Sequence, residues 1–166
     1  GAVVLATSGY TPLLDTSLSR WASPGYAWRG TTGKAPGSLP MPCFVDEGFV
    51  SLRPLPDGRL MVSAWRPSRT SSEDPDRALR RGLARLLRRH FPEAARRFPE
   101  RASGIVGCTP DGIPVVGALS DPPRIYFALG LGGWGLSLAF VVAERVVDLL
   151  LNNTPPGILG ESREGR

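Results

Sequence analysis

The sequence contains few of the side chains that most metal and nucleophilic sites require. Among 166 residues there are two cysteines, Cys43 and Cys108, and one histidine, His90. The cysteines lie far apart and outside any CxxC pattern, so they predict neither a metal site nor a disulfide framework. A lone histidine at the end of an amphipathic segment is usually a packing or capping residue, and we assign it no role. The sequence therefore predicts no metal site, and it indicates reduced, cytoplasmic thiols.

Other common signals are missing as well. No GxGxxG segment followed by an acidic residue is present, although this is the usual phosphate-binding signature of dinucleotide folds. No charged and then apolar leader with a small-residue cleavage site is seen, so secretion is not expected. Lysine is nearly absent, because Lys34 stands against 19 arginines. We interpret this skew, and the net charge of +5, as biased coding as much as selection for a polyanionic partner.

What is present predicts a globular domain. Apolar residues make up 42% and charged residues 21% of the chain, which is a globular balance. The 17 prolines and 20 glycines predict many turns. A chain of this length can bury a core.

Residues 104–151 contain several local patterns in a fixed order. Residues 109–114, TPDGIP, combine two prolines with an Asp-Gly pair and predict a tight reversal. Residues 124–129, RIYFAL, predict a short buried strand that stops at a glycine. Residues 130–135, GLGGWG, run directly into an apolar helix over residues 135–151. The order is loop, strand, glycine turn and helix.

A glycine turn that opens a buried helix leaves backbone N–H groups at the positive end of the helix dipole. An electron-rich group is expected to bind there, since no side chain blocks the approach. A phosphate is the commoner ligand, but no acidic residue follows this turn about 20 residues on at a strand end, as the dinucleotide-binding signature requires. The turn by itself therefore does not name its ligand.

Earlier segments predict four further strands and one helix. Residues 2–7, AVVLAT, are typical of a buried parallel strand, and residues 20–40 predict a strand followed by a loop. Residues 47–53 and 59–65 flank a Pro-Asp-Gly turn and predict a β-hairpin. A possible cap at Asp74, Pro75 in the first turn and leucines at three- and four-residue steps predict a helix over residues 75–91.

The polar face of that helix carries six arginines, at positions 77, 80, 81, 85, 88 and 89. Such a face could bind phosphates. We interpret it as solvated, because the sequence shows no stacking aromatic residues interleaved with the arginines and no recognisable docking motif.

The patterns of residues 104–151 together resemble the C-terminal segment of the FAD-dependent oxidoreductases related to D-amino-acid oxidase, glycine oxidase and sarcosine oxidase. Residues 2–7 are similar to the strand that completes the FAD-binding domain of this family, with Ser8 where the family usually has glycine. Residues 52–60, LRPLPDGRL, look like a hairpin of its substrate domain.

The resemblance implies an α+β fold. We expect an antiparallel substrate-domain sheet of three or four strands that carries the helix of residues 75–91. Remnant strands and the C-terminal helix of a Rossmann-like FAD-binding domain should accompany it, with residues 3–6 and 125–129 side by side against that helix. The implied segments are a remnant strand (1–12), a substrate-domain-like part (13–103), a flavin-contacting segment (104–152) and a mobile tail (153–166).

The resemblance also implies which residues contact a non-covalent FAD. In the family the glycine turn lies under the flavin ring. The residues expected to bind the cofactor are Ala6, Thr7, Asp111, Gly112, Ile113, Gly130, Leu131, Gly132, Gly133, Trp134, Gly135 and Leu136. Arg53 is the expected substrate-binding residue. No catalytic residue is identified, because in flavin chemistry the cofactor itself accepts the hydride.

Besides Ser8, three positions depart from the family pattern. Val106 stands where amino-acid oxidases of the family often have an arginine that holds the substrate carboxylate, and Leu131 stands where a histidine is often seen. No cysteine occupies the position near Gly104 where sarcosine oxidases attach their flavin covalently.

The implied function is that of the C-terminal part of an FAD-dependent oxidoreductase. It would oxidise the C–N bond of a small amine or amino-acid-like substrate by hydride transfer to flavin. A missing N-terminal half or a partner subunit would hold the pyrophosphate and ribose, so the chain alone should neither bind FAD tightly nor be active.

Two alternatives belong to other classes. Residues 125–143 are 19 positions without a charge, close to the roughly 20 that span a bilayer, which would make residues 125–151 a membrane segment. Four glycines in this stretch disfavour a continuous helix. The arginines could instead mark a nucleic-acid-binding domain with salt-dependent affinity. We expect neither a membrane span nor a nucleic-acid partner.

Overall fold

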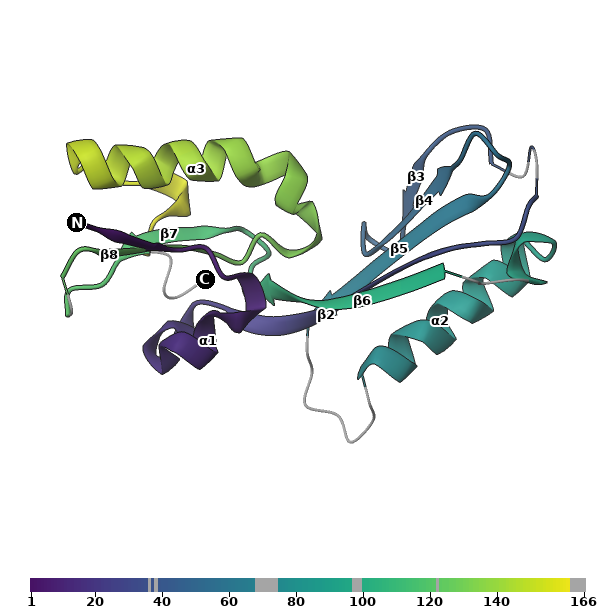
Figure 1. The fold of residues 1–166 in the computed structure, drawn as a ribbon, viewed down its shortest axis with the longest axis horizontal. Helices are drawn as coiled ribbons and strands as arrows, with labels where there is room; N and C mark the ends of the chain where they lie inside the picture. Colours follow the sequence, from purple (N-terminus) through teal and green to yellow (C-terminus); the bar gives the residue numbers. More distant parts are fainter. Residues whose placement is uncertain (36, 38, 68–74, 97–99, 122, 162–166) are drawn as a thin grey trace. The chain divides into compact units, whose positions relative to one another are not determined.

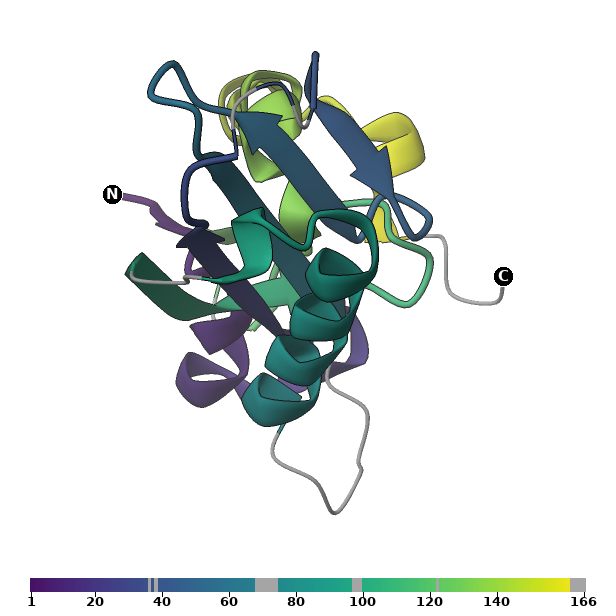
Figure 2. The same cartoon turned by 90° about the vertical axis from the view of Figure 1, so that its right-hand side faces the viewer.

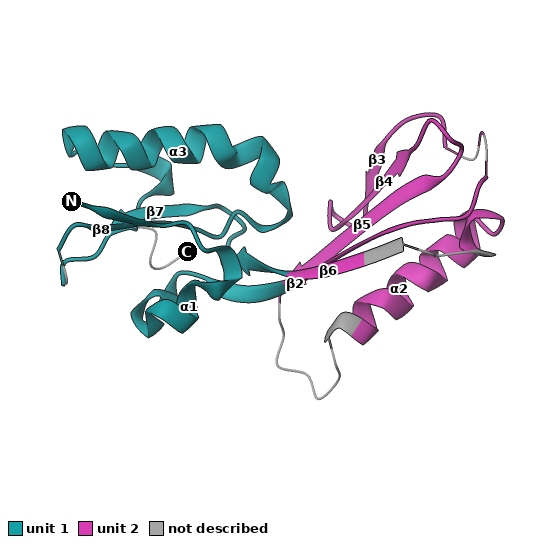
Figure 3. Cartoon of the chain, viewed as in Figure 1, with its two compact units in different colours: residues 1–25, 105–166 teal, residues 26–104 magenta. Residues whose placement is uncertain are grey.

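The structure is a computed structural model that describes residues 1–35, 37, 39–67, 75–96, 100–121 and 123–161. The chain forms two compact units, coloured separately in Figure 3. Unit 1 contains Gly1–Gly25 and Ile105–Arg166, and unit 2 contains Tyr26–Gly104.

A three-stranded sheet forms the centre of unit 1, in the order β1-β8-β7. Strand β1 (Val3–Leu5) pairs in parallel with β8 (Ile125–Leu129), with Val3 opposite Ile125. Strand β7 (Val115–Ala118) pairs antiparallel with β8. The predicted side-by-side placement of residues 3–6 and 125–129 is confirmed. Strand β7 was not predicted, because four residues that include a glycine carry too weak a strand signal.

Helix α3 (Gly135–Asn152) covers one face of this sheet, as predicted (Figure 1). Its Val142 and Val146 pack against Val116, Ala128 and Leu159. The alternation of side chains along a strand sends the neighbours of these sheet residues to the opposite face.

On the opposite face Val115, Phe127 and Leu129 pack against Leu18 and Trp21. Three short helical turns follow β1: η1 (Ser8–Tyr10), α1 (Thr11–Leu14) and η2 (Thr16–Arg20), and Leu18 belongs to η2. Burying each of these large side chains contributes about 1.5–3 kcal/mol. Strands β7 and β8 are therefore covered on both faces, which explains why both are apolar.

Two backbone segments of unit 1 cross at unusually short range. A Cβ atom placed on Gly9 would lie 2.5 Å from Ile105 Cγ2 and 2.6 Å from the Val106 carbonyl oxygen. Gly107 N–H donates to Ser8 Oγ (3.1 Å). Ser8 has a φ of 55°, which is the left-handed region that favours glycine. The position where the family usually has glycine therefore keeps a glycine-like backbone here.

Unit 2 is built on a five-stranded sheet in the order β3-β4-β5-β2-β6. Its strands are β3 (Cys43–Val45), β4 (Val50–Pro54), β5 (Leu60–Pro67), β2 (Ser23–Thr31) and β6 (Glu100–Cys108), and the first residues of β2 and the last of β6 belong to unit 1. The α+β fold is confirmed, but the expected number of strands, three or four, was too low. Strand β3 is only three residues long, and β6 mixes charged residues with glycine, so neither gives a clear strand pattern.

The predicted hairpin is present. Strands β4 and β5 pair antiparallel, with Val50 opposite Ala64. In the turn between them Gly58 has a φ of 82° and its N–H donates to the Leu55 carbonyl oxygen (3.0 Å). An Asp-Gly pair suits such a turn because it tolerates positive φ.

Helix α2 (Pro75–His90) lies along one face of the five-stranded sheet (Figure 2). Leu83 and Leu87 of the helix pack into a core with Trp28 and Val62, which confirms the predicted amphipathic helix. The short turn η3 (Ala94–Arg96) follows Pro92. The predicted cap residue, Asp74, lies outside the described residues.

Part of the expected tail is packed. The turn η5 (Gly157–Leu159) places Leu159 in the core beneath α3, and Glu161 Oε1 accepts from Ala118 N–H (3.1 Å). Residues 162–166 lie outside the described part of the chain. Within the described residues, no helix has both the length and the apolar content that crossing a bilayer requires.

The crossing at Gly9 can be tested with a matched pair of variants. Gly9→Ala is expected to lower the free energy of unfolding by about 1–3 kcal/mol, because the added methyl group meets the backbone of Val106. Gly104→Ala should change it by less than about 0.5 kcal/mol, since a Cβ there meets nothing within 4 Å. Urea unfolding followed by circular dichroism measures both, and equal losses would contradict the close crossing.

Candidate cofactor site at one edge of the small sheet

Sheet topology brings the predicted cofactor-contacting segments of unit 1 to one edge. Parallel strands end at the same edge, so residues 6–7, which follow β1, and residues 130–136, which follow β8, leave the sheet on the same side. Strand β7 runs the other way, with Val115 opposite Leu129. The loop of residues 109–114 therefore enters the sheet at that same edge.

The loop before β7 is a tight reversal, as predicted. Gly112 has a φ of 74° and its N–H donates to the Thr109 carbonyl oxygen (3.3 Å). Asp111 Oδ1 accepts from the N–H of Ile113 (3.0 Å), which is the usual way that an aspartate closes a turn. Asp111 and Gly112 are exposed, whereas Ile113 is half-buried against the core under α3.

The glycine turn after β8 uses positive φ at two positions, Gly130 (74°) and Gly132 (53°). Leu131 forms an isolated antiparallel bridge with Cys108, and its carbonyl oxygen accepts from Trp134 N–H (3.1 Å). A short 3-10 turn, η4 (Gly132–Trp134), then leads directly into α3. The chain thus reverses from strand to helix within a few residues.

The first turn of α3 is suited to an electron-rich ligand. In the described structure Trp134, which precedes α3, makes no side-chain hydrogen bond that caps the helix, and the first turn of α3 contains no acidic residue. Gly133 is exposed and Gly135 half-buried. The first turn of the helix thus leaves its positive dipole end without a carboxylate of its own.

Thr109 connects the loop to the glycine turn. A Cβ atom on Gly130 would collide with the Thr109 side chain, so only glycine fits there. Thr109 is 7% exposed, and its Oγ1 has no hydrogen-bond partner among the described residues. A buried hydroxyl without a partner is uncommon and calls for a ligand or water. Sequence reasoning identified the loop but assigned no role to this hydroxyl.

The remaining predicted residues fall into two groups. Ala6 is exposed and Thr7 half-buried at the end of β1, where Thr7 Oγ1 hydrogen-bonds Thr11 Oγ1 (2.9 Å). Arg53 lies in unit 2 on β4, where it is exposed and its Nη2 donates to Met61 Sδ (3.8 Å). Its role toward a substrate stays a prediction.

Cys108 lies directly before the loop and is 3% exposed. Burial raises the pKa of its thiol to about 11, because the thiolate loses hydration in the core. At neutral pH this thiol is protonated and a poor nucleophile.

Comparison with known proteins assigns the chain to a family. The sequence profile of the family described as FAD dependent oxidoreductase (DAO) matches residues 1–149. The chain belongs to the DAO family. No curated protein matches it. The glycine turn and the reversal described above lie within the matched residues.

Solved structures agree with the DAO fold. Glycine oxidase from Geobacillus kaustophilus shares 19% sequence identity with this chain at a TM-score of 0.67. The match covers 90% of this chain and 41% of the oxidase chain. Glycine oxidase from Bacillus cereus ATCC 14579 shares 15% sequence identity with this chain at a TM-score of 0.69. The match covers 95% of this chain and 44% of the oxidase chain. L-proline dehydrogenase from P. horikoshii shares 19% sequence identity at a TM-score of 0.66, and the match covers 93% of this chain and 43% of the dehydrogenase chain. The chain therefore spans less than half the length of these DAO relatives.

The contact between the glycine turn and the loop predicts different effects for two neighbouring glycines. Gly130→Ala is expected to lower the free energy of unfolding by about 2 kcal/mol or more, because it combines a positive φ with a collision at Thr109. Gly135 has a φ of −50° and its nearest neighbour would be Leu131 Cβ at 3.8 Å. Gly135→Ala should therefore be neutral or slightly stabilising. Urea unfolding of the two variants compares them, and a larger loss for Gly135→Ala would refute this geometry.

Proposed function

We propose that this chain supplies the flavin-ring end of an FAD-dependent oxidoreductase that oxidises the C–N bond of an amine or amino-acid-like substrate. The observation that carries the proposal is the convergence at one edge of unit 1. The uncapped start of α3, the glycine turn and the unpartnered Thr109 hydroxyl all lie there. Together they fit a flat heteroaromatic ring that carries acceptor atoms on its rim.

FAD supplies the hydride acceptor when it is bound. The chain's own residues have simpler tasks. The backbone N–H groups at the start of α3 would face the ring edge on which negative charge develops. Gly133 is exposed, and a Cβ atom on Gly135 would meet only Leu131 Cβ at 3.8 Å, so both would leave room for the ring. The reversal at residues 109–113 holds Thr109 beside the turn. The packed sheet fixes these groups before any ligand arrives.

The substrate class is proposed from the relatives. Two of the solved neighbours are glycine oxidases and another is an L-proline dehydrogenase, so an amine or amino-acid-like molecule is the natural candidate. The apolar side chain of Val106 can offer neither a positive charge nor a pair of N–H donors to a substrate carboxylate. Arg53, exposed on β4, is the proposed substrate-binding residue. Leu131 in the glycine turn has an apolar side chain, so it cannot hydrogen-bond the flavin or the substrate.

We further propose that the cofactor is held non-covalently and that another protein segment holds its pyrophosphate and ribose. The protonated, buried thiol of Cys108 supports the first point. An apolar stripe supports the second, because Leu136 (96% exposed) and Phe140 (88%) lie on the side of α3 turned away from its sheet. Val3 and Val4 of the edge strand β1 are exposed too, and such surfaces are usually covered by further chain.

Weak binding of the ring end alone tests the proposed function. In ¹⁵N-labelled chain, millimolar FMN, which carries the flavin ring without the adenosine, should shift the amide resonances of residues 130–136 and 109–113. AMP, which carries the other end of FAD, should leave them unmoved, because these residues are proposed to contact the flavin ring alone. Unmoved amides with FMN, or equal shifts with AMP, would refute the assignment of the ring to this edge.

A bulky side chain at Gly135 should block that binding without disturbing the fold. A Cβ atom on Gly135 would lie 3.8 Å from its nearest neighbour, Leu131 Cβ, so the Gly135→Val chain should fold. The FMN-induced shifts should fall at least fivefold, because the valine side chain excludes the ring. Ala139→Val is the control, since Ala139 is exposed one turn further along α3 and gains a similar volume. Circular dichroism verifies folding, and retention of the full shifts in Gly135→Val would show that the turn does not contact the ring.

A further inference from the structure

Unit 2 contains a hollow that the proposed flavin chemistry does not use. It lies between α2, the start of β4 and the end of β5, and has a volume of about 560 Å³, within the range of small-molecule sites. Leu79, Leu83 and Leu86 line it from the helix, together with Gly82, and Phe49 lines it from the chain before β4. We call it the Phe49 hollow. Most of its described lining residues are aliphatic or aromatic.

The two charged residues of the described lining neutralise each other. The Arg66 guanidinium forms an ion pair with the Asp46 carboxylate, and it lies over the ring of Phe49, 4.2 Å from the ring centroid. The ring of Phe49 in turn contacts that of Trp65, with the centroids 4.8 Å apart. A charged ligand would therefore give up hydration here without gaining an unpaired counter-ion.

The turn that carries Asp46 is held in a conformation that its sequence does not favour. Asp46, Glu47 and Gly48 have positive φ values of 56°, 57° and 86°, although the first two are not glycine. The Phe49 N–H donates to the Asp46 carbonyl oxygen (3.0 Å) and closes the turn. Such a backbone persists only where its surroundings hold it, and it is common at ligand sites. The ion pair with Arg66 is one of the interactions that hold it here.

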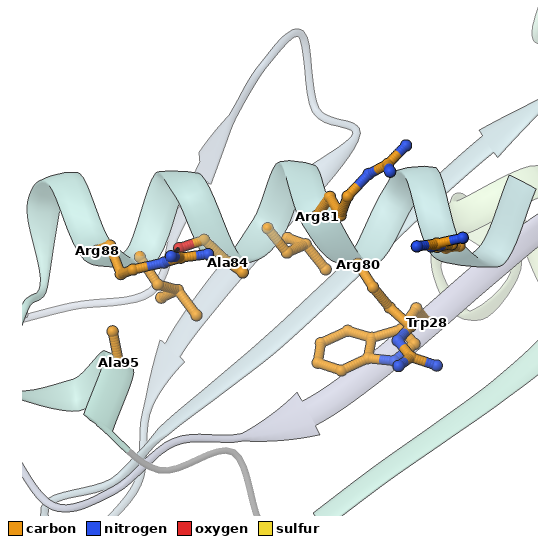
Figure 4. Close-up of a pocket in the computed structure, with 9 residues that line it drawn as sticks. Trp28, Arg80, Arg81, Ala84, Arg88 and Ala95 are labelled. Carbon is orange, nitrogen blue, oxygen red and sulfur yellow. Dashed lines mark hydrogen bonds between the residues drawn. The ribbon is translucent and has the colours of Figure 1, made fainter.

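A larger hollow on another side of α2 provides a contrast (Figure 4). Its lining includes four arginines. Arg80 and Arg81 already have interaction partners, and Arg88 Nε donates to the Ala84 carbonyl oxygen (3.0 Å). We assign that hollow no ligand, because its cations are engaged. The Phe49 hollow has a single arginine, whose charge is balanced within the lining itself.

We propose that the Phe49 hollow binds a small uncharged molecule with an aromatic or aliphatic body. The leucines of α2 and the Phe49 ring would shield that body from water. The balanced pair of Asp46 and Arg66 makes the site select against a net charge of either sign. The whole lining belongs to unit 2, so its occupancy is independent of the flavin assigned to unit 1.

The indole N–H resonance of Trp65 reports on this site, because its ring contacts Phe49. It is one of four tryptophan indole signals and is assigned by comparison with Trp65→Phe. At constant ionic strength 2-naphthalenemethanol is the probe, and 2-naphthoate and 2-naphthylmethylammonium are its charged counterparts. The expected result is a saturable shift with the neutral probe, at a Kd about tenfold lower than with either charged one. No saturable shift, or a charged counterpart that binds as tightly, would overturn the proposal.

A leucine added at Gly82 should close the hollow without harming the fold. Gly82 is exposed on α2 and a Cβ atom there would meet nothing within 4 Å, so Gly82→Leu should fold with a better helix former. It is expected to weaken binding of 2-naphthalenemethanol about tenfold. Ala84→Leu is the control, because Ala84 lines the other hollow (Figure 4). Circular dichroism verifies both folds, and equal affinities of the two variants would overturn the location of the site.

Removing one charge of the ion pair tests the selectivity. Asparagine tolerates positive φ, so Asp46→Asn should keep the turn while it leaves the Arg66 charge unbalanced. This variant is expected to bind 2-naphthoate about fivefold more tightly than the unchanged chain does. Asp57→Asn makes the same change in net charge outside the lining, where Asp57 pairs with Arg59, and should leave the affinity unchanged. An equal gain in both variants would show that net charge alone controls binding and would overturn the role of the pair.

Discussion

The parallel pairing of β1 with β8 is the contact on which the candidate site depends. It joins residues from opposite ends of the chain, with Val3 opposite Ile125 and Leu5 opposite Phe127. Because parallel strands end at one edge, this register alone decides that the chain leaving β1 and the glycine turn leaving β8 emerge together. The antiparallel partner β7 then brings the reversal at residues 109–113 to the same edge. No local sequence feature could do this separately.

Close backbone approach is the second constraint, and it explains where side chains are missing or unusual. Gly9 crosses the backbone of Val106, and Gly130 contacts Thr109, at distances that leave no room for a Cβ atom. Ser8 is the exception, since it adopts a φ of 55° without being glycine. A strained backbone of this kind costs about 1–2 kcal/mol, and the hydrogen bond that Ser8 Oγ accepts from Gly107 N–H offsets part of it.

Patterns that are local in sequence could be predicted, and contacts set by tertiary packing could not. The reversal at residues 109–113, the strand β8, the helices α2 and α3 and the β4–β5 hairpin follow from turn residues and apolar spacing. Strand β7 is too short to show a period. The unpartnered hydroxyl of Thr109 depends on burial, which no spacing reports. The packing of Trp28 against Leu83 and Leu87 of α2 joins segments far apart in the sequence, so no local spacing reports it.

Helix α3 bears on two parts of the proposal: the position of the flavin ring and the need for a further segment of protein. Val142 and Val146 bury one side of it against the sheet, while Leu136, Phe140 and Leu151 expose the other. A helix that is apolar on both sides needs cover on both sides, and covering each of these residues would contribute about 1.5–3 kcal/mol. The start of the same helix is proposed to offer N–H groups to a flavin ring whose pyrophosphate another segment would hold. A single further segment packed against α3 would satisfy both requirements, because it would cover the stripe and stand next to the edge where the ring is proposed to lie.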